Sequence, residues 1–448
     1  MSRDVPIDRS LWSDTAGERA PRPALEGDQT ADVVIVGAGY SGLWTAYYLL
    51  ARSPGLRVVV VEREHVGFGA SGRNGGWAIG ELASHDVTPT MTRALFEAVA
   101  EIGRVVSSEQ IECDYAAGGT IRVARTAPQL TRQRTEVAEM HARGFTERDL
   151  RLLSADEARR ELAAEGVLGG LFFAHAAALH PLKLVRGVAA AVERRGATIF
   201  EDTPVTAVEP GEVVTPHGVV RADVVVLATE AYTRDLPGRR RTFVPLYSQM
   251  IATEPLPEST WDEIGLAGRA TFADDRHVVI YGQRTADDRI AFGARGNPAY
   301  LFGSRISRRT ESSAHEAIAE VLRELLPQVA EAQITHRWGG VLAVPRDWKP
   351  TVAFDAVTRF GSLGGFVGEG VAATNLAGAT MADLVLGRAT EGTALAWVNH
   401  RSRRWEPEPL RWAAINAAFA ALARADRIER ETGNESRLAK AVLKLIGR

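Results

Sequence analysis

The first hundred residues contain two unbroken apolar runs separated by a helix-like segment. Residues 33–36, VVIV, and residues 58–61, VVVV, are apolar at consecutive positions, as in strands that are buried on both faces of a parallel sheet. Between them the chain reads as a glycine turn followed by a helix. This order predicts a β-α-β unit over residues 31–62, with both strands in one parallel sheet.

The rest of the chain also alternates between strand and helix patterns, and residues 1–28 are expected to form an extended arm that carries Trp12. Helical spacing predicts helices at 91–110, 128–143, 154–164, 309–326 and 399–448, and after Pro181 and Gly370. Alternating or apolar runs predict strands at 114–124, 168–174, 241–255, 277–282, 289–295, 334–345, 351–354 and 363–367, with several short strands inside 197–228.

These elements predict two interleaved domains, in a fold that combines α/β and α+β architecture. The first is a Rossmann-like domain, and the second is built on an antiparallel sheet inserted into it. The expected limits are residues 1–29 for the arm, 30–109, 165–239 and 336–398 for the Rossmann-like domain, 110–164 and 240–335 for the inserted domain, and 399–448 for a C-terminal helical segment.

The turn between the first strand and its helix has the spacing Gly37-x-Gly39-x-x-Gly42. In dinucleotide-binding folds the first glycine permits the tight turn, the second lets the backbone approach a pyrophosphate, and the third lets helix and strand pack closely. The helix N-terminus then offers free N–H groups to the phosphates. Glu62, at the end of the second strand, can accept hydrogen bonds from the ribose hydroxyls of an adenosine. The combination predicts a dinucleotide site.

Composition narrows the possible functions. The chain of 448 residues is long enough for two domains, and its formal net charge of −3 gives no basis for nucleic-acid binding. The single cysteine, Cys113, excludes a disulfide within the chain. The polar start, MSRDVPIDRSLW, predicts no secretory leader, and no apolar run reaches the ~18 residues that span a bilayer. We expect a cytoplasmic protein without an integral membrane segment.

Three separated stretches resemble one family. They are GAGYSG followed by VER, GFGASGRNGG, and GGFVGEGVAATNLAG followed by MADLVLG, with VLATEAYT between the second and third. Together they resemble the D-amino-acid oxidase-like FAD-dependent oxidoreductases, and within them the γ-glutamylputrescine oxidoreductase and sarcosine oxidase-like amine oxidase branch. The resemblance covers residues 30–400. It implies a glutathione reductase-type FAD-binding domain, with the flavin ring against the sheet of the second domain.

The resemblance also implies which residues contact FAD. The first glycine turn would hold the pyrophosphate, the acid and its neighbour the adenosine, and the two later glycine-rich stretches the ribityl chain and the flavin. In chain order, the implied contacts are Gly37, Gly39, Tyr40, Ser41, Gly42, Glu62, Arg63, Ala70, Ser71, Gly72, Arg73, Asn74, Gly75, Gly76, Val205, Ala228, Thr229, Gly340, Gly368, Glu369, Gly370, Val371 and Thr374.

The mode of FAD attachment follows from the same comparison. Relatives that bind FAD covalently use a cysteine in the strand near the flavin or a histidine after the second glycine-rich stretch. Here the strand HRWGGVLAVP has no cysteine, Trp77 follows the glycines, and Cys113 lies in neither place. We therefore expect non-covalent FAD, and no metal ion.

The implied reaction is the oxidation of a primary or secondary amine to an imine, by hydride transfer to flavin N5. Some oxidases of the family carry a lysine above the flavin that promotes reaction with O2, but the corresponding strand here, DRIAFGAR, has none. The electron acceptor is therefore O2 or another carrier. We expect a monomer or a homodimer.

Two substitutions bear on the substrate. Sarcosine oxidase-like relatives bind the substrate carboxylate through an arginine and a lysine, and this chain has Glu81 and Ala372 at those positions. Glu369, in the last glycine turn, adds an acid near the expected flavin. Acids in place of bases favour a cationic or polyamine-like amine. The alternatives are a solvated loop acid at Glu81 and a helix cap at Glu369.

Four further side chains are candidates for the catalytic site. His180 precedes the helix that starts at Pro181, Tyr247 and Tyr281 lie on strands of the second domain, and Trp338 stands beside a glycine pair. A capping role for His180 and core packing for the three aromatic residues are the alternative readings. Three arginines on neighbouring strands could bind an anionic group or be solvated, namely Arg276, Arg289 and Arg295.

The sequence therefore predicts an FAD-dependent amine oxidoreductase. An amino-acid dehydrogenase with another electron acceptor and a non-catalytic flavin-binding protein are alternatives. The glycine turn alone would also allow an NAD-dependent dehydrogenase, but the later glycine-rich stretches argue against it. The sequence does not distinguish among polyamines, γ-glutamyl amines, N-methyl amino acids and aminophosphonates as substrate.

Overall fold

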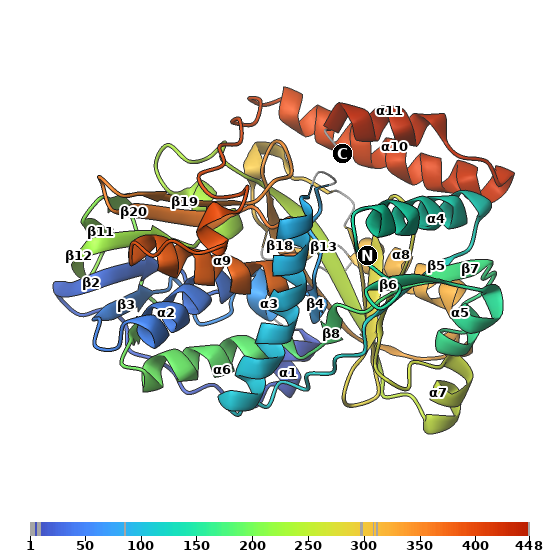
Figure 1. Ribbon diagram of the computed structural model, residues 1–448, viewed down its shortest axis with the longest axis horizontal. Helices are drawn as coiled ribbons and strands as arrows, with labels where there is room; N and C mark the ends of the chain where they lie inside the picture. Colours follow the sequence, from blue (N-terminus) through green and yellow to red (C-terminus); the bar gives the residue numbers. More distant parts are fainter. Residues whose placement is uncertain are drawn as a thin grey trace.

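Two eight-stranded sheets lie side by side in the computed structural model, which describes residues 5–6, 10–84, 87–295, 299–307, 309–310 and 312–446 (Figure 1). The first sheet belongs to the Rossmann-like part and the second to the inserted part. Both predicted kinds of domain are therefore present. Two smaller strand pairs join β1 (Val5–Pro6) to β17 (Arg309–Thr310) and β4 (Trp77–Ile79) to β8 (Ala176–Ala178).

The first sheet contains the predicted β-α-β unit. β2 (Gln29–Val36) leads through α2 (Tyr40–Arg52) to β3 (Val58–Val61), and the two strands pair in parallel. All residues of the two apolar runs are buried, which explains their lack of alternation. The other strands of this sheet are β9 (Thr198–Phe200), β10 (Ala207–Glu209), β11 (Glu212–Thr215), β12 (Gly218–Leu227), β19 (Thr351–Asp355) and β20 (Phe360–Gly364).

Helices pack tightly beside this sheet. α9 (Gly370–Val385) packs against α2, and a Cβ at Gly378 would lie only 2.6 Å from Cβ of Trp44. The glycine therefore allows the two helices to approach closely. α3 (Pro89–Ser108) packs against α9, and α6 (Pro181–Arg194) packs against α2.

The second sheet is antiparallel except for one pair. Its strand order is β18-β13-β16-β15-β14-β5-β7-β6, and only β14 and β5 run parallel. The bounds are β5 (Thr120–Ala124), β6 (Leu150–Leu153), β7 (Gly169–Phe173), β13 (Val244–Thr253), β14 (Thr271–Asp274), β15 (Ile280–Arg284), β16 (Ile290–Arg295) and β18 (Ile334–Val344).

Two strands of this sheet fall in ranges expected for the Rossmann-like domain. β7 pairs with β5 and β6, and β18 pairs with β13 over most of its length. Their apolar, partly alternating patterns fit either sheet, and only the strand pairing places them in the second one. The exact domain limits remain a prediction.

The other helices lie around the two sheets. In the described part of the chain, none is both long enough and apolar enough to cross a membrane. Their bounds are α1 (Leu11–Thr15), α4 (Ala127–Ala142), α5 (Ala155–Glu161), α7 (Glu258–Ile264), α8 (Ser312–Leu325), α10 (Leu410–Thr432) and α11 (Arg437–Ile446), with short 3-10 turns η1 (Ala70–Gly72), η2 (Glu230–Asp235), η3 (Phe302–Ser304), η4 (Pro327–Val329) and η5 (Gly392–Ala394).

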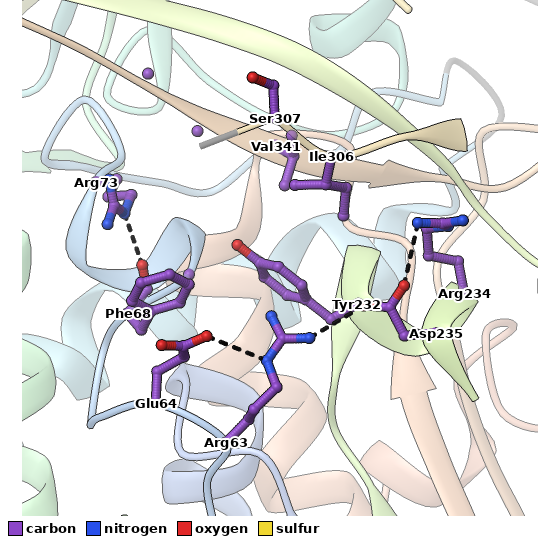
Figure 2. A pocket seen from close by; sticks show the side chains of 13 residues that line it. Arg63, Glu64, Phe68, Arg73, Tyr232, Arg234, Asp235, Ile306, Ser307 and Val341 are labelled. Atoms are coloured by element: carbon purple, nitrogen blue, oxygen red, sulfur yellow. Dashed lines mark hydrogen bonds and ion pairs between the residues drawn. The ribbon is translucent and has the colours of Figure 1, made fainter. Parts of the chain in front are cut away.

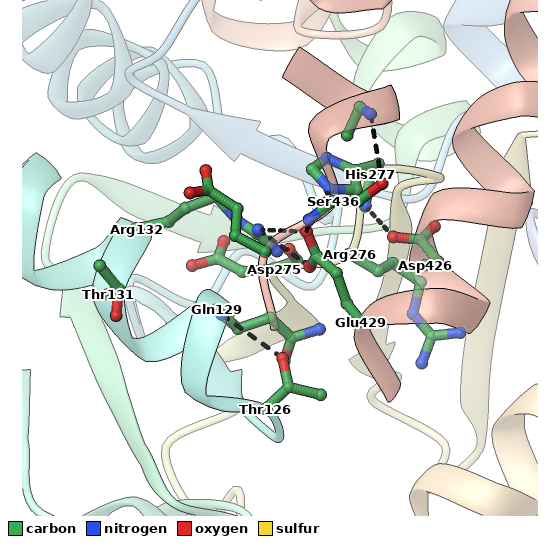
Figure 3. A network of polar contacts seen from close by, with 12 residues as sticks. Thr126, Gln129, Thr131, Arg132, Asp275, Arg276, His277, Asp426, Glu429 and Ser436 are labelled. Atoms are coloured by element: carbon green, nitrogen blue, oxygen red, sulfur yellow. Dashed lines mark hydrogen bonds and ion pairs between the residues drawn. The ribbon is translucent and has the colours of Figure 1, made fainter. Parts of the chain in front are cut away.

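A buried polar network attaches α10 to the second sheet (Figure 3). Glu429 accepts hydrogen bonds from Arg132 of α4 at 3.0 Å and from the N–H of Ser436 at 3.1 Å, and its carboxylate also pairs with His277 at 3.1 Å. Asp426 accepts from the backbone N–H of His277 at 2.7 Å. The C-terminal helices are therefore docked on the loop that follows β14.

Several expected elements differ in their bounds, and three of the differences have a clear physical reason. The arm is not extended throughout, because residues 11–15 form α1 with Ser10 as its cap. β5 begins at Thr120 rather than at residue 114, after Gly119 adopts a positive φ of 73°. The C-terminal helix begins only at Leu410, after Pro407 and Pro409, whose rings disfavour a preceding helix.

Candidate functional site

The first glycine turn joins β2 to α2 and leaves no room for side chains. Gly37 has a φ of 109°, and a Cβ there would lie 2.5 Å from the carbonyl oxygen of Ala228. A Cβ at Gly42 would lie 2.0 Å from the carbonyl oxygen of Gly37, and one at Gly39 would lie 2.9 Å from Oγ of Ser71. The turn therefore brings bare backbone to the N-terminus of α2, as a pyrophosphate site needs.

Glu62 lies directly after β3, beside this turn. Its Oε2 accepts from the N–H of Ala38 at 2.9 Å and its Oε1 accepts from the N–H of Glu64 at 3.0 Å. Burial raises the pKa of Glu62, and the two N–H groups partly oppose that rise. A carboxylate oxygen has two lone pairs, so each oxygen can still accept one ribose hydroxyl.

A cavity of about 330 Å³ opens between the segment after β3, η2 and β18 (Figure 2). Arg63 lies at its edge, paired with Asp235 at 3.1 Å and stacked over the ring of Tyr232 at 4.8 Å. Three of the residues implied as FAD contacts line this cavity, namely Arg63, Arg73 and Gly340.

The loop after η1, which comprises residues 73–76, is stabilised by side-chain hydrogen bonds to its own backbone. Asn74 donates from Nδ2 to the carbonyls of Ala70 and Ser71, and its Oδ1 accepts from the N–H of Gly76 at 2.8 Å. Oγ of Ser71, in η1, accepts from the N–H of Tyr40 at 2.9 Å, which links η1 to the start of α2. A Cβ at Gly72 would lie 2.3 Å from the carbonyl oxygen of Gly67.

The remaining implied FAD contacts lie at the ends of strands or in α9. Ala228 and Thr229 directly follow β12, and the Ala228 carbonyl faces Gly37. Val205 packs on an apolar cluster formed mainly by β2, β3, β11 and β12. The other members are Ser41 in α2, Gly368 before α9 with a φ of 109°, and Gly370, Val371 and Thr374 in its first turns. Their contacts with FAD remain predictions.

One face of the second sheet points toward these loops. Residues that pair across antiparallel strands lie on the same face of the sheet. Met250 of β13 pairs with Trp338 of β18 and with Gly293 of β16, and Gly293 pairs with Tyr281 of β15. Tyr281, Met250 and Trp338 therefore share one face. A Cβ at Gly75 would lie 2.7 Å from the ring of Tyr281, so this face meets the loop after η1. Ser248 lies on the same face, and its Oγ is 2.6 Å from Oη of Tyr281.

Tyr247 lies on the opposite face of β13. It is paired with Val341, and its hydroxyl accepts from the N–H of Ser307 at 2.5 Å and donates to the carbonyl of Arg305 at 3.3 Å. The structure therefore does not bring Tyr247 to Tyr281 and Ser248. Its partners Ser307 and Val341 line the cavity of Figure 2, and its place in the catalytic site remains a prediction.

His180 is the cap of α6. Its Nδ1 accepts from the N–H of Lys183 at 3.2 Å, and its Nε2 lies 3.0 Å from Oγ1 of Thr15. Burial lowers the pKa of His180 to about 4, so its ring is neutral at pH 7. Both nitrogens are engaged, as the capping alternative requires, and a catalytic role remains a prediction.

Glu369 occupies the cap position of α9, but its side chain makes no capping bond to the helix. Instead it interacts electrostatically with Glu81, Tyr281 and Arg295. Glu81 lies in the loop after β4, Tyr281 lies in β15, and Arg295 lies in β16. Burial raises the pKa of Tyr281 to about 12 and lowers that of Arg295. The structure thus gathers Glu369, Glu81 and Tyr281 from three separate elements.

The surroundings of Glu81 shift its ionisation. Burial raises its pKa to about 7; Arg122 opposes that rise, while Glu136, Glu369 and Asp275 add to it. Such an acid changes its charge near neutral pH. Asp275 and Arg122 were not singled out from the sequence, since only the fold brings β5 and β14 beside the loop after β4.

Of the three candidate arginines, two pair with acids two positions earlier in the chain. Arg276 pairs with Asp274 at 2.6 Å, and Arg289 pairs with Asp287 at 2.8 Å. Arg295 shares the face of Ser248 and lies near Glu369 and the ring of Trp348. Only Arg295 therefore joins the group around Tyr281.

Comparison with known proteins agrees with this geometry. The chain matches the model of the family described as DAO, FAD dependent oxidoreductase, over residues 32–384. It is 30% identical over 406 residues to γ-glutamylputrescine oxidoreductase of Escherichia coli (strain K12), covering 87% of this chain and 92% of that protein. It is 29% identical over 412 residues to the probable oxidoreductase OrdL of Haemophilus influenzae, covering 85% of this chain and 88% of that protein.

The fold agrees as well. The crystal structure of glycine oxidase from Geobacillus kaustophilus superposes with a TM-score of 0.71 at 18% sequence identity, covering 84% of this chain and 100% of that one. At such identity the likeness concerns the fold. The glycine turn, Glu62 and the match along residues 32–384 together identify the chain as a member of the DAO family of FAD-dependent oxidoreductases.

Proposed function

We propose that this enzyme oxidises the C–N bond of a primary or secondary amine to an imine, and that the substrate carries a positive charge. The observation that supports this most strongly is that Glu369, at the N-terminus of α9, interacts electrostatically with Glu81 and Tyr281. Acids are the side chains that attract an ammonium group. The E. coli relative carries the name of an amine oxidoreductase, which supports the same reaction class.

FAD would supply the hydride acceptor when bound. The protein would hold the pyrophosphate at the glycine turn, the ribose at Glu62, and the flavin between the loop after η1, Gly340 and the start of α9. The positive end of the α9 dipole favours negative charge close to its N-terminus. Non-covalent attachment is supported by Cys113, which is buried and whose pKa burial raises to about 12.

The side chains near the flavin would bind and orient the amine. Glu369 would attract its ammonium group, and Tyr281 with Ser248 would limit the space above the flavin. Trp338 would support the loop after η1, and His180 would fix the start of α6. Reoxidation by O2, with release of H2O2, is part of the proposal.

A second candidate function is an amino-acid dehydrogenase that uses another electron acceptor. Arg295 favours it, because a half-buried guanidinium near Glu369 could bind a carboxylate. A flavin-binding protein without turnover is a third possibility, and reduction by any amine would exclude it. A cytoplasmic location and a monomeric or homodimeric state remain predictions.

Substrate charge provides the test. We expect Glu369→Gln to raise KM for a diamine about tenfold or more while leaving KM for a neutral-tailed amine within about twofold, because a charge-assisted contact contributes about 1.5–3 kcal/mol. Glu331→Gln, at an exposed position, is the matched control. Equal KM changes for both amines would contradict the proposed role of Glu369.

A further inference from the structure

Two tryptophans from distant parts of the chain bind neighbouring carbonyls of the loop after η1. Nε1 of Trp338, on β18, donates to the Arg73 carbonyl at 3.0 Å. Nε1 of Trp12, on α1, donates to the Asn74 carbonyl at 2.9 Å. The two indoles meet edge to face, with ring centroids 6.0 Å apart. Trp12 therefore belongs to the support of this loop, although it lies in the N-terminal arm.

A third side chain binds the next two carbonyls. Nε2 of Gln283, on β15, donates to the carbonyl of Gly75 at 2.7 Å and lies 3.2 Å from that of Gly76. Gln283 is fully buried. Four consecutive carbonyls, at positions 73–76, thus face donors from the surrounding protein. This arrangement fixes the orientation of each peptide plane in the loop.

The N–H groups of the same loop are paired, with one exception. Those of Arg73 and Asn74 donate to the Ala70 carbonyl, and that of Gly76 donates to Oδ1 of Asn74. The N–H of Gly75 has no acceptor among the described residues, although Gly75 is buried. Buried backbone N–H groups without a partner are rare in native proteins. The exception indicates that a bound group supplies the acceptor.

Trp12 controls the direction of this N–H. The Asn74 carbonyl and the Gly75 N–H belong to one planar peptide unit and point to opposite sides of it. Because Trp12 holds the carbonyl, the N–H must point away from Trp12. Without that bond the plane could rotate, since glycine tolerates a wide range of backbone angles.

The helix that carries Trp12 is itself firmly held. Trp12 is 2% exposed and meets the ring of His180 at 4.9 Å. Oγ1 of Thr15 lies 3.0 Å from Nε2 of His180. Asp14 pairs with His336 of β18 at 3.4 Å. Contacts with α6, β18 and the loop after η1 therefore fix α1 in place.

We propose that Trp12 is a positioning residue for the flavin: it orients the Asn74–Gly75 peptide so that the Gly75 N–H donates to an acceptor atom of the bound FAD. The proposal rests on FAD binding as described under the proposed function. It gives the N-terminal arm a role in tuning the cofactor. Trp338 and Gln283 hold the adjoining peptides in the same way.

The test compares FAD affinity and reduction potential in purified holoenzymes. We expect Trp12→Phe to raise the Kd for FAD about threefold to tenfold, as loss of one hydrogen bond does. The midpoint potential should fall, because the N–H stabilises the added negative charge of the reduced flavin. A tenfold preference for the reduced form corresponds to about 30 mV for two electrons. Amide exchange at residues 70–77 should also slow on adding FAD to the parent protein.

Trp397→Phe is the matched control. Trp397 is 3% exposed and lies in the same apolar cluster as Trp12. Its Nε1 has no acceptor among the described residues, so it tests the loss of a buried indole alone. If Trp12→Phe does not fold, 3-benzothienylalanine at position 12 removes the N–H at nearly constant shape. If the Trp12 variants keep the Kd for FAD and the midpoint potential of the parent protein, the proposal is overturned. A parent protein that binds no FAD would overturn the proposed function as well.

Discussion

Gly42 leaves no space for even a methyl group, because a Cβ there would lie 2.0 Å from the Gly37 carbonyl oxygen. We predict that Gly42→Ala forces α2 away from β2, costs about 1–3 kcal/mol of folding free energy and lowers the FAD content of the purified protein. Thermal unfolding and flavin release measure both effects. Gly268→Ala, where nothing lies within 4 Å and φ is not positive, is the control. Full FAD content in Gly42→Ala would show that close packing here is dispensable.

Glu81 gives the site a dependence on pH. Its pKa is raised to about 7, so the side chain is neutral below that pH and anionic above it. A cationic competitive inhibitor should therefore bind more tightly as the pH rises from about 6 to about 8. A quaternary ammonium compound is the suitable probe, because its own charge does not titrate. We predict that its inhibition constant falls several-fold over this range.

The control for this pH effect is Glu81→Gln, in which the inhibition constant should stay constant over the same range. A pH dependence that persists in Glu81→Gln would assign the titration to another group. Glu331→Gln, at an exposed position, should behave like the parent protein.

The sequence identified candidate strands for the pocket but not the face to which each side chain points. Neighbouring residues of a strand point to opposite faces, so a choice between Tyr247 and Ser248 requires the register of β13. The pairing of Met250 with Trp338 sets that register and turns Ser248 toward the loop after η1. Gln283 could have been found from Tyr281, because residues two apart in β15 share a face.

Among the secondary-structure elements, α10 offers the clearest prediction. Burial opposes charge on Glu429, but bonds from His277 and the Ser436 N–H, together with Arg132, lower its pKa to about 2 (Figure 3). An acid with a lowered pKa stabilises the fold above its ordinary value of 4.5 and loses that effect as the pH falls toward 2. We therefore predict that α10 and α11 detach in this acid range, which amide exchange of residues 410–446 would detect.

At neutral pH, Glu429→Gln should reproduce part of this effect and cost about 2 kcal/mol, since the charged acceptor is lost. Glu431→Gln, on the exposed side of the same helix, should leave exchange unchanged. Equal protection in both variants would mean that apolar contacts alone hold α10.

Most elements were predictable because their apolar runs and helical spacing are long. The β-α-β unit and α9 were predicted within a few residues. β20 was expected at residues 363–367 but lies at Phe360–Gly364, because Gly365 turns the chain with a φ of 84°. The start of α10 depends on Pro407 and Pro409, and their positions in the sequence were the available signal.

For the molecule as a whole, the sequence predicted two interleaved domains but not where the N-terminal arm packs against them. Trp12 contacts the loop at Asn74 and the strand at Trp338, which are 62 and 326 positions away in the chain. No local sequence pattern predicts a contact between residues so far apart in the chain. Likewise, Glu81, Glu369 and Tyr281 come together only because both sheets meet at the loop after η1.

The central claim is that FAD bound between the two sheets is reduced by an amine. The most direct measurement is the visible absorption spectrum of the FAD-loaded protein under anaerobic conditions, before and after addition of a diamine or a γ-glutamyl amine. The account predicts that the flavin band is bleached, and that the band returns when air or another electron acceptor is admitted. A protein that binds no FAD, or whose flavin band is unchanged by every amine tested, would contradict it.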